Sequence, residues 1–147
     1  MVRVVVTGAA SSLGRRVARL LSQRDDVDEV VALDLRSEPG IGPIDLVTSD
    51  LVAAFDETDA IIHLASAFGP MVEGEEVHAA ADVAMAKRVL DTAAKLSIDR
   101  VVLLSSATVY GPWANNPVPL TEDAPLRPHP DLTYAVQLAE VERLAAE

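Results

Sequence analysis

The 147-residue sequence has no cysteine and few aromatic residues: one Trp, two Tyr and two Phe. Without cysteine, a disulfide framework, a thiolate nucleophile and a thiolate metal site are all excluded. Half of the residues are hydrophobic although only 3% are aromatic. The core must therefore consist of Val, Leu, Ile and Ala, which is typical of a parallel sheet covered by helices.

Positive charge and long apolar runs are also scarce. Twelve Lys and Arg face 23 Asp and Glu, which gives a net charge of −11 and argues against nucleic acid or an anionic membrane as a partner. No apolar run approaches transmembrane length, and the chain begins directly with a strand-like segment that leaves no room for a signal peptide. We expect a cytoplasmic protein without a metal site, whose residues 1–147 form a single domain.

A glycine turn follows the first predicted strand. A β-branched run starts at Val2, the chain turns at Gly8, and helical periodicity begins near Gly14. Strand, glycine turn and helix start in this order predict the phosphate-binding corner of a Rossmann-type βαβ unit. Gly8 would allow the tight turn and Gly14 the close approach of the helix, whose first N–H groups would meet a pyrophosphate.

The turn reads Gly8-Ala-Ala-Ser-Ser-Leu-Gly14 and departs from the usual spacing at one position. It resembles the Thr-Gly-x-x-Gly-x-x-Gly pattern of the short-chain dehydrogenase/reductase family, with Ser11 in place of the middle glycine. The β-carbon of Ser11 would weaken dinucleotide binding, or its hydroxyl would donate to a phosphate. The alternative is a helix N-cap without any ligand.

An acidic residue ends the second predicted strand, which covers residues 29–34. Asp34 lies 34 − 14 = 20 residues after Gly14, where the motif requires a carboxylate for the ribose 2′-hydroxyl. A carboxylate there repels a 2′-phosphate, so NAD is preferred over NADP, although nearby Arg36 keeps NADP open. The alternative is a solvated acid at a strand end.

Helices and strands alternate through the rest of the chain, which predicts an α/β fold. We expect a Rossmann-type doubly wound parallel sheet of about five strands in the order 3-2-1-4-5. The further strands are expected at 44–47, 58–64 and 100–104, the later helices at 77–96 and 132–147, and loops at 37–43, 69–76 and 111–131. Six prolines exclude regular structure from the last loop. His63 lies in an apolar run, which indicates a buried structural histidine rather than a catalyst.

Motifs in the second half of the chain extend the resemblance. The string Val101-Val-Leu-Leu-Ser-Ser-Ala-Thr-Val-Tyr-Gly111 is similar to the extended branch of the short-chain dehydrogenase/reductases, especially nucleotide-sugar epimerases and dehydratases. The likeness continues in Asp50-Leu51, His63-Leu-Ala-Ser66, Pro119 to Pro125 and Tyr134. One such motif is weak evidence, whereas the whole ordered set is specific.

The resemblance implies roles for individual residues. Asp50 and Leu51 would border the adenine, and Leu64 to Ser66 would pass under the cofactor. Ser106 would hold a substrate oxygen, while Tyr134 would act as the acid/base and contact the nicotinamide cofactor. The expected cofactor-binding residues are Gly8, Ser11, Ser12, Leu13, Gly14, Asp34, Leu35, Asp50, Leu51, Leu64, Ala65, Ser66 and Tyr134.

The sequence departs from the family where the catalytic tyrosine needs help. A free phenol titrates near pH ~10, so work near neutrality requires a pKa lower by about three units, or ~4 kcal/mol. The family supplies this with a lysine in Tyr-x-x-x-Lys, but the chain has Leu138 four residues after Tyr134. Leu138 equally fits an apolar helix face, and Ser106 equally fits a structural serine at a strand end. Asp82 also stands where the family usually has asparagine.

Three functions remain open at this stage; beside the two that follow, the third is a structural subunit with an empty cleft. The first is an NAD-dependent epimerase/dehydratase-type oxidoreductase acting on a nucleotide-sugar-like substrate, with an impaired Tyr-x-x-x-Lys motif. The second is a non-catalytic dinucleotide-binding regulatory or scaffold module. Family members commonly continue past this helix into a substrate-binding region, so we expect the chain to be part of a longer protein. The family also implies a possible homodimer through its two long helices.

Overall fold

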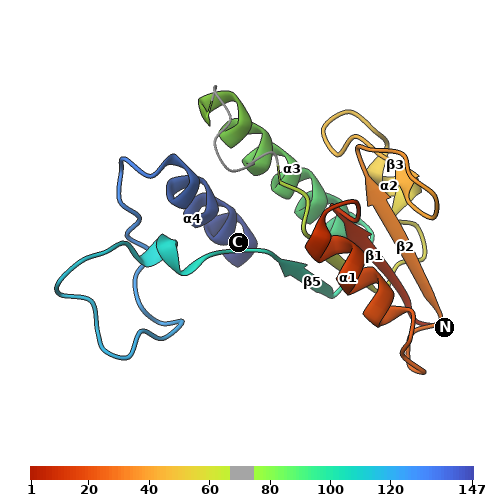
Figure 1. The fold of residues 1–147 in the computed structure, drawn as a ribbon, viewed down its shortest axis with the longest axis horizontal. Coiled ribbons are helices and arrows are strands. Elements are labelled where there is room, and N and C mark those ends of the chain that lie inside the picture. Colours follow the sequence, from red (N-terminus) through yellow and green to blue (C-terminus); the bar gives the residue numbers. More distant parts are fainter. Residues whose placement is uncertain (67–74) are drawn as a thin grey trace. The chain divides into compact units, whose positions relative to one another are not determined.

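A computed structural model describes the backbone of residues 1–66 and 75–147 and the side chains of residues 1–66 and 81–147 (Figure 1). In chain order the elements are β1 (Arg3–Thr7), α1 (Ser12–Leu21), β2 (Glu29–Asp34), β3 (Gly42–Pro43), α2 (Leu51–Ala54), β4 (Ala60–His63), α3 (Glu75–Lys95), β5 (Arg100–Leu103), the 3-10 helix η1 (Ala107–Tyr110) and α4 (Thr133–Ala146).

The five strands form one parallel sheet in the order β3-β2-β1-β4-β5. This confirms the doubly wound Rossmann-type fold predicted from the alternation of helices and strands. The central strand β1 pairs with β2 on one side and with β4 on the other. The glycine turn therefore leaves the sheet where the strand order reverses, which is the usual position of a ligand site in such folds.

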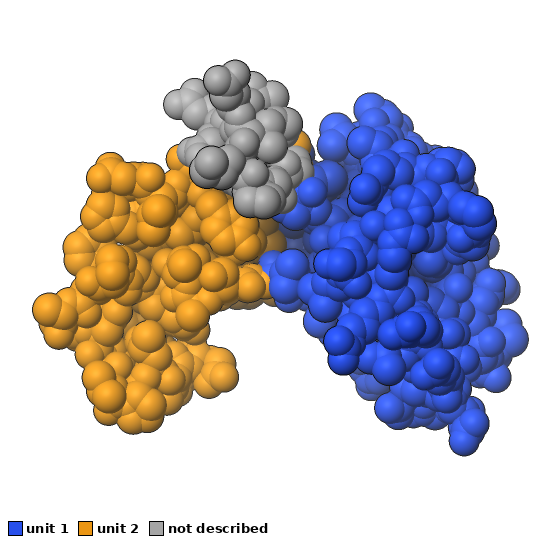
Figure 2. Space-filling view, viewed as in Figure 1, with its two compact units in different colours: residues 1–66, 84–104 blue, residues 67–83, 105–147 orange. Residues whose placement is uncertain are grey.

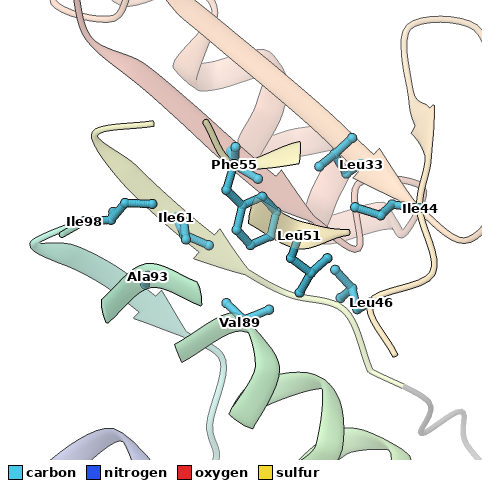
Figure 3. Packing of buried hydrophobic residues seen from close by; sticks show 10 residues of the cluster. Leu33, Ile44, Leu46, Leu51, Phe55, Ile61, Val89, Ala93 and Ile98 are labelled. Carbon is cyan, nitrogen blue, oxygen red and sulfur yellow. The ribbon is translucent and has the colours of Figure 1, made fainter. Parts of the chain in front are cut away.

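Alternate residues of the strands supply two hydrophobic layers. Val5 and Ile61 pack with Val89 of α3 and Phe55 beside α2, in the cluster that Figure 3 shows. Val4 and Val6 point to the opposite face, where residues of α1 pack against them. Because side chains alternate along a strand with period 2, a run of β-branched residues fills both layers of a sheet that is buried on both sides.

The third strand lies elsewhere in the chain than the sequence predicts. It was expected over 44–47, but β3 is only Gly42–Pro43, and residues 46–48 form a turn. Ile44 and Leu46 are nevertheless buried in the core. Asp45 explains the difference, because its carboxylate accepts hydrogen bonds from the Val47 N–H and the Thr48 hydroxyl and so closes a turn.

The other elements lie close to their predicted bounds. Strand β4 is shorter than the predicted 58–64, and two short helices, α2 and η1, were not predicted. The loop at 111–131 contains no helix or strand, as its prolines indicated. Of the loop expected at 69–76, residues 69–74 lie outside the described part of the chain, and the last two belong to α3.

The chain forms two compact units, which Figure 2 colours separately. Unit 1 comprises residues 1–66 and 84–104 and contains the sheet; unit 2 comprises residues 67–83 and 105–147. Each unit has a hydrophobic cluster of its own, and that of unit 2 joins η1 to α4. Within the described residues, no helix is both long and apolar enough to cross a membrane.

Candidate functional site

The glycine turn of unit 1 requires glycine at both of its ends. Gly8 has φ +71°, and a Cβ there would lie 2.5 Å from the backbone nitrogen of Ala65. A Cβ on Gly14 would lie 2.7 Å from Cα of Ala9. The turn therefore lies directly against the chain that follows β4, and α1 starts directly against the turn. These are the tight turn and the close helix approach that the sequence motif predicted.

Ser11 is the N-cap of α1. Its hydroxyl accepts a hydrogen bond from the Gly14 N–H at 2.9 Å and donates one to the Gly8 carbonyl at 2.8 Å. The hydroxyl hydrogen is thus engaged inside the turn. Ser12 and Leu13 occupy the first helical positions, where backbone N–H groups have no partner within the helix.

Asp34 lies beside the turn although it is 24 residues from Ala10. One of its oxygens accepts a hydrogen bond from the Ala10 N–H at 2.9 Å, and the other accepts from the Arg36 N–H at 3.0 Å. Burial acts to raise the pKa of this carboxyl, but the hydrogen bonds from Arg36 and Ala10 and the Arg36 guanidinium outweigh it, so the pKa lies below its ordinary value. The sequence thus places a fixed negative charge at the turn. The neighbouring Leu35 is exposed.

Asp50 and Leu51 have structural roles in unit 1. The Asp50 carboxylate caps α2 by accepting hydrogen bonds from the Val52 and Ala53 N–H groups. The Leu51 side chain is 1% exposed and belongs to the same core cluster as Leu46, beside which it lies in Figure 3. Any contact of Leu51 with an adenine would therefore come from its backbone rather than from its side chain.

Leu64, Ala65 and Ser66 continue from the end of β4. The Leu64 N–H donates to the Thr7 carbonyl at 3.1 Å, so this stretch stays hydrogen-bonded to the end of β1. One residue earlier, His63 is 5% exposed, and its Nδ1 lies 2.7 Å from Oγ1 of Thr7. Burial lowers the pKa of His63 to about 4, so it is neutral at pH 7. The interpretation of His63 as a buried structural histidine is confirmed.

Ser106 begins η1 in unit 2. Its Oγ accepts one hydrogen bond from the Thr108 N–H at 3.3 Å and a second from the Thr108 hydroxyl at 3.0 Å. Two donors on the oxygen leave the hydroxyl hydrogen of Ser106 to donate elsewhere. The sequence motif indicates Ser106 but not Thr108. The sequence signal for this contact is the position of Thr108, two residues after a serine that caps a helix.

Tyr134 lies in the first turn of α4 and is 38% exposed. Leu138, one turn further on, is 8% exposed and packs with Val109 and Ala139. Ser105, the residue before Ser106, donates its hydroxyl to the carboxylate of Glu142 on α4. Unit 2 thus carries both residues expected to act in catalysis, and the residue four positions after Tyr134 is a buried leucine.

The described part of unit 2 offers no lysine in place of Leu138. Its arginines are Arg127 and Arg143. Arg127 donates to the Asn116 side chain at 2.7 Å, and Arg143 pairs with Glu140 at 3.1 Å. Both guanidinium groups thus bond to neighbours on their own loop or helix.

Comparison with known proteins supports the assignment that the motifs suggest. L-arabinose 1-dehydrogenase (NAD(P)(+)) of Haloferax volcanii is 29% identical over an alignment of 148 positions, which covers 92% of this chain and 57% of that protein. A short-chain dehydrogenase/reductase superfamily protein from Agrobacterium tumefaciens, solved with bound NAD, is 30% identical with a TM-score of 0.76 over 97% of this chain and 44% of its own. MoeE5, solved with UDP-glucose and NAD, is 28% identical with a TM-score of 0.80 over 97% of this chain and 48% of its own.

The chain spans 37% to 57% of the length of the curated relatives that it matches. The model of the NAD dependent epimerase/dehydratase family matches residues 4–147, which is nearly the whole chain. The glycine turn, Asp34, Ser106 and Tyr134 lie within this range. The chain therefore belongs to the NAD dependent epimerase/dehydratase family.

Proposed function

We propose that this chain is the cofactor-binding part of an NAD-dependent epimerase/dehydratase-type oxidoreductase that acts on a nucleotide-sugar-like substrate. The observation that carries the proposal is the contact between the glycine turn and Asp34. This contact joins the turn that would bind the phosphates to the carboxylate that would hold the ribose, both within unit 1.

The residues of unit 1 fit the dinucleotide. Because Gly8 has no side chain, the turn can lie against Ala65. The first N–H groups of α1 and the positive end of its helix dipole lie at the turn. Asp34 would hold the ribose hydroxyls, and its charge would repel the additional phosphate of NADP. When bound, NAD would supply the centre that accepts or donates a hydride.

The residues of unit 2 would handle the substrate. Ser106 would donate its hydroxyl hydrogen to a substrate oxygen, because Thr108 already occupies the acceptor positions of its Oγ. Tyr134 would exchange a proton with a substrate hydroxyl. The nucleotide-sugar class rests on the solved relatives that hold such compounds, MoeE5 with UDP-glucose among them.

Calorimetric titration of the chain with oxidised and reduced NAD and NADP tests the cofactor assignment. We expect NAD to bind at least about tenfold more tightly than NADP, equivalent to about 1.4 kcal/mol. Asp34→Asn keeps the side-chain size and removes the charge, and we expect it to reduce this preference. Equal binding of both cofactors by the unmodified chain would contradict the proposed role of Asp34, and no binding of either would contradict the proposal as a whole.

A non-catalytic dinucleotide-binding module is the second candidate, and the burial of Leu138 favours it. A leucine can neither carry a positive charge beside a tyrosinate nor bind a ribose hydroxyl. Turnover of UDP-glucose by the unmodified chain and by Leu138→Lys discriminates between the two candidates. Activity that appears only in the lysine variant identifies a degenerate member of the family, whereas activity of the unmodified chain excludes the non-catalytic candidate.

A further inference from the structure

One polar pair interrupts the aliphatic core of the sheet. Thr7 is fully buried and His63 is 5% exposed, and they lie directly opposite each other on β1 and β4. The next pair toward the amino ends of these strands on the same face is Val5 and Ile61, both fully buried. Aliphatic residues are the rule in a strand covered on both faces, so a polar pair at this level requires a reason.

The position of the pair supplies that reason. Thr7 and His63 are the last residues of their strands, and each is followed directly by a segment proposed to hold the cofactor. Thr7 leads into the glycine turn at Gly8, and His63 leads into Leu64 to Ser66. The side-chain hydrogen bond therefore joins the two strands at the point where both segments begin.

The glycine turn and the Leu64–Ser66 stretch are in close backbone contact. A Cβ on Gly8 would lie 2.5 Å from the Ala65 nitrogen and 2.6 Å from the Leu64 carbonyl carbon, so the two backbones are in close contact. A shift of a few tenths of an ångström between the strand ends would therefore change the contact of the turn with this stretch. Aliphatic packing resists compression but fixes no direction, whereas a 2.7 Å hydrogen bond fixes both a distance and an angle.

We propose that the Thr7–His63 hydrogen bond sets the spacing between the glycine turn and the Leu64–Ser66 stretch, which makes His63 a positioning residue for the dinucleotide. His63 acts through the backbone on either side of it rather than by touching the ligand. This inference rests on the proposed function for its ligand, while the spacing itself is a property of the chain alone.

Paired substitutions test the inference by NAD titration. Thr7→Val removes only the hydroxyl, and His63→Leu removes the ring nitrogen; we expect each to weaken NAD binding about tenfold. The double variant should bind about as weakly as either single one, because both substitutions break the same bond. Thr7→Ser and His63→Asn keep a polar atom at the contact, and we expect both to bind within about threefold of the unmodified chain.

Ile61→Val is the matched control for a loss of stability alone. It lies on the same strand and face as His63, one level away from the turn, and packs in the core. We expect it to lower the urea midpoint of unfolding but to leave NAD affinity within about twofold. An Ile61→Val chain that loses affinity as much as His63→Leu would overturn the inference, as would a His63→Leu chain with unchanged affinity.

Amide hydrogen exchange without any ligand separates this inference from the proposed function. The Leu64 N–H bonds to the Thr7 carbonyl, and the Ala9 N–H bonds to the Leu33 carbonyl. We expect His63→Leu to raise the exchange rates of the Leu64 and Ala9 amides at least about tenfold relative to the rate of the Val5 amide. We expect Ile61→Val to leave this ratio unchanged. Were the unmodified chain to bind no NAD, the proposed function would fail, and these rates would decide the spacing role. Unchanged rates would overturn it.

Discussion

The residues at the motif positions meet different structural requirements in units 1 and 2. In unit 1 the motif residues meet geometric demands of the backbone: Gly8 has a positive φ and Gly14 has no room for a Cβ. In unit 2 the residue four positions after Tyr134 is Leu138, which belongs to the cluster between η1 and α4. The turn in unit 1 thus requires its glycines for steric reasons, whereas position 138 is a packing position.

The difference shows which kind of motif residue can change without loss of the fold. A glycine in contact with backbone admits no side chain, because the neighbouring backbone cannot move away. A long side chain on a helix can be exchanged for a shorter apolar one that buries more completely.

Gly14→Ala should have the largest effect. Its Cβ would press on the backbone of Ala9 at 2.7 Å, so α1 must move away from the turn. We expect a loss of about 3 kcal/mol in the free energy of unfolding, together with loss of NAD binding. Urea denaturation followed by circular dichroism and calorimetric titration measure the two effects.

The control is Gly40→Ala, where a Cβ would meet nothing within 4 Å although φ is +79°. We expect this variant to lose about 1 kcal/mol through backbone strain alone and to retain NAD affinity. Equal losses for the two variants would mean that the contact between α1 and the turn contributes nothing beyond local strain.

His63 should make unit 1 sensitive to acid. Its pKa is lowered from 6.5 to about 4 in the folded chain, so between these values the unfolded chain binds a proton that the folded chain does not. Stability therefore falls as the pH decreases from 6.5 to 4, by about 3 kcal/mol in total. Asp34 loses its own contribution only below its ordinary value of 3.8.

Urea midpoints measured from pH 7 to pH 4 check the dependence. The His63→Asn chain cannot titrate at this position, so we expect its stability to change much less over this range. A pH dependence that is the same in both chains would show that other groups cause it.

Leu138→Lys should destabilise unit 2. The side chain is 8% exposed and packs with Val109, so a lysine there must place its ammonium at the edge of an apolar cluster. We expect a loss of about 2 kcal/mol, moderated by the flexible stem of lysine. Trp113 is the single tryptophan of the chain and lies in unit 2, so its fluorescence in urea follows this unit.

Ala145→Lys on the same helix serves as the control, because residue 145 is exposed. We expect its midpoint to stay within about 0.5 kcal/mol of the unmodified chain. A Leu138→Lys chain as stable as the control would show that the packing of unit 2 does not require leucine at this position.

Ser11 should have the smallest effect. Ser11→Ala removes the cap on the Gly14 N–H, and we expect a loss of about 1 kcal/mol; Ser11→Gly restores the usual glycine of the family and should cost only about 0.3 kcal/mol. Because the Ser11 hydroxyl is engaged by Gly8 and Gly14, we expect Ser11→Gly to bind NAD at least as tightly as the unmodified chain. Weaker NAD binding would support the alternative in which the hydroxyl donates to a phosphate.

The fold followed closely from local patterns. The β-branched and apolar runs, the glycine positions and the alternation of helices and strands predicted a parallel, doubly wound sheet, because each of these signals is local in the sequence. The third strand was misplaced because Ile44 and Leu46 are buried in a turn, and burial produces the same alternation as a strand. Asp45, which closes that turn, carries no signal that distinguishes it from any other loop acid.

Sequence patterns were sufficient to predict the strand order, the glycine turn and the family, and they show that no lysine lies four residues after Tyr134. The folded chain was needed to show that the Ser11 hydroxyl is engaged within the turn, that Thr108 bonds to Ser106, and that Thr7 pairs with His63. It also shows that Leu138 is a core residue. Periodicity and spacing are properties of neighbours in the chain, whereas a hydrogen bond across 56 residues or the filling of a cluster depends on which segments the fold brings together.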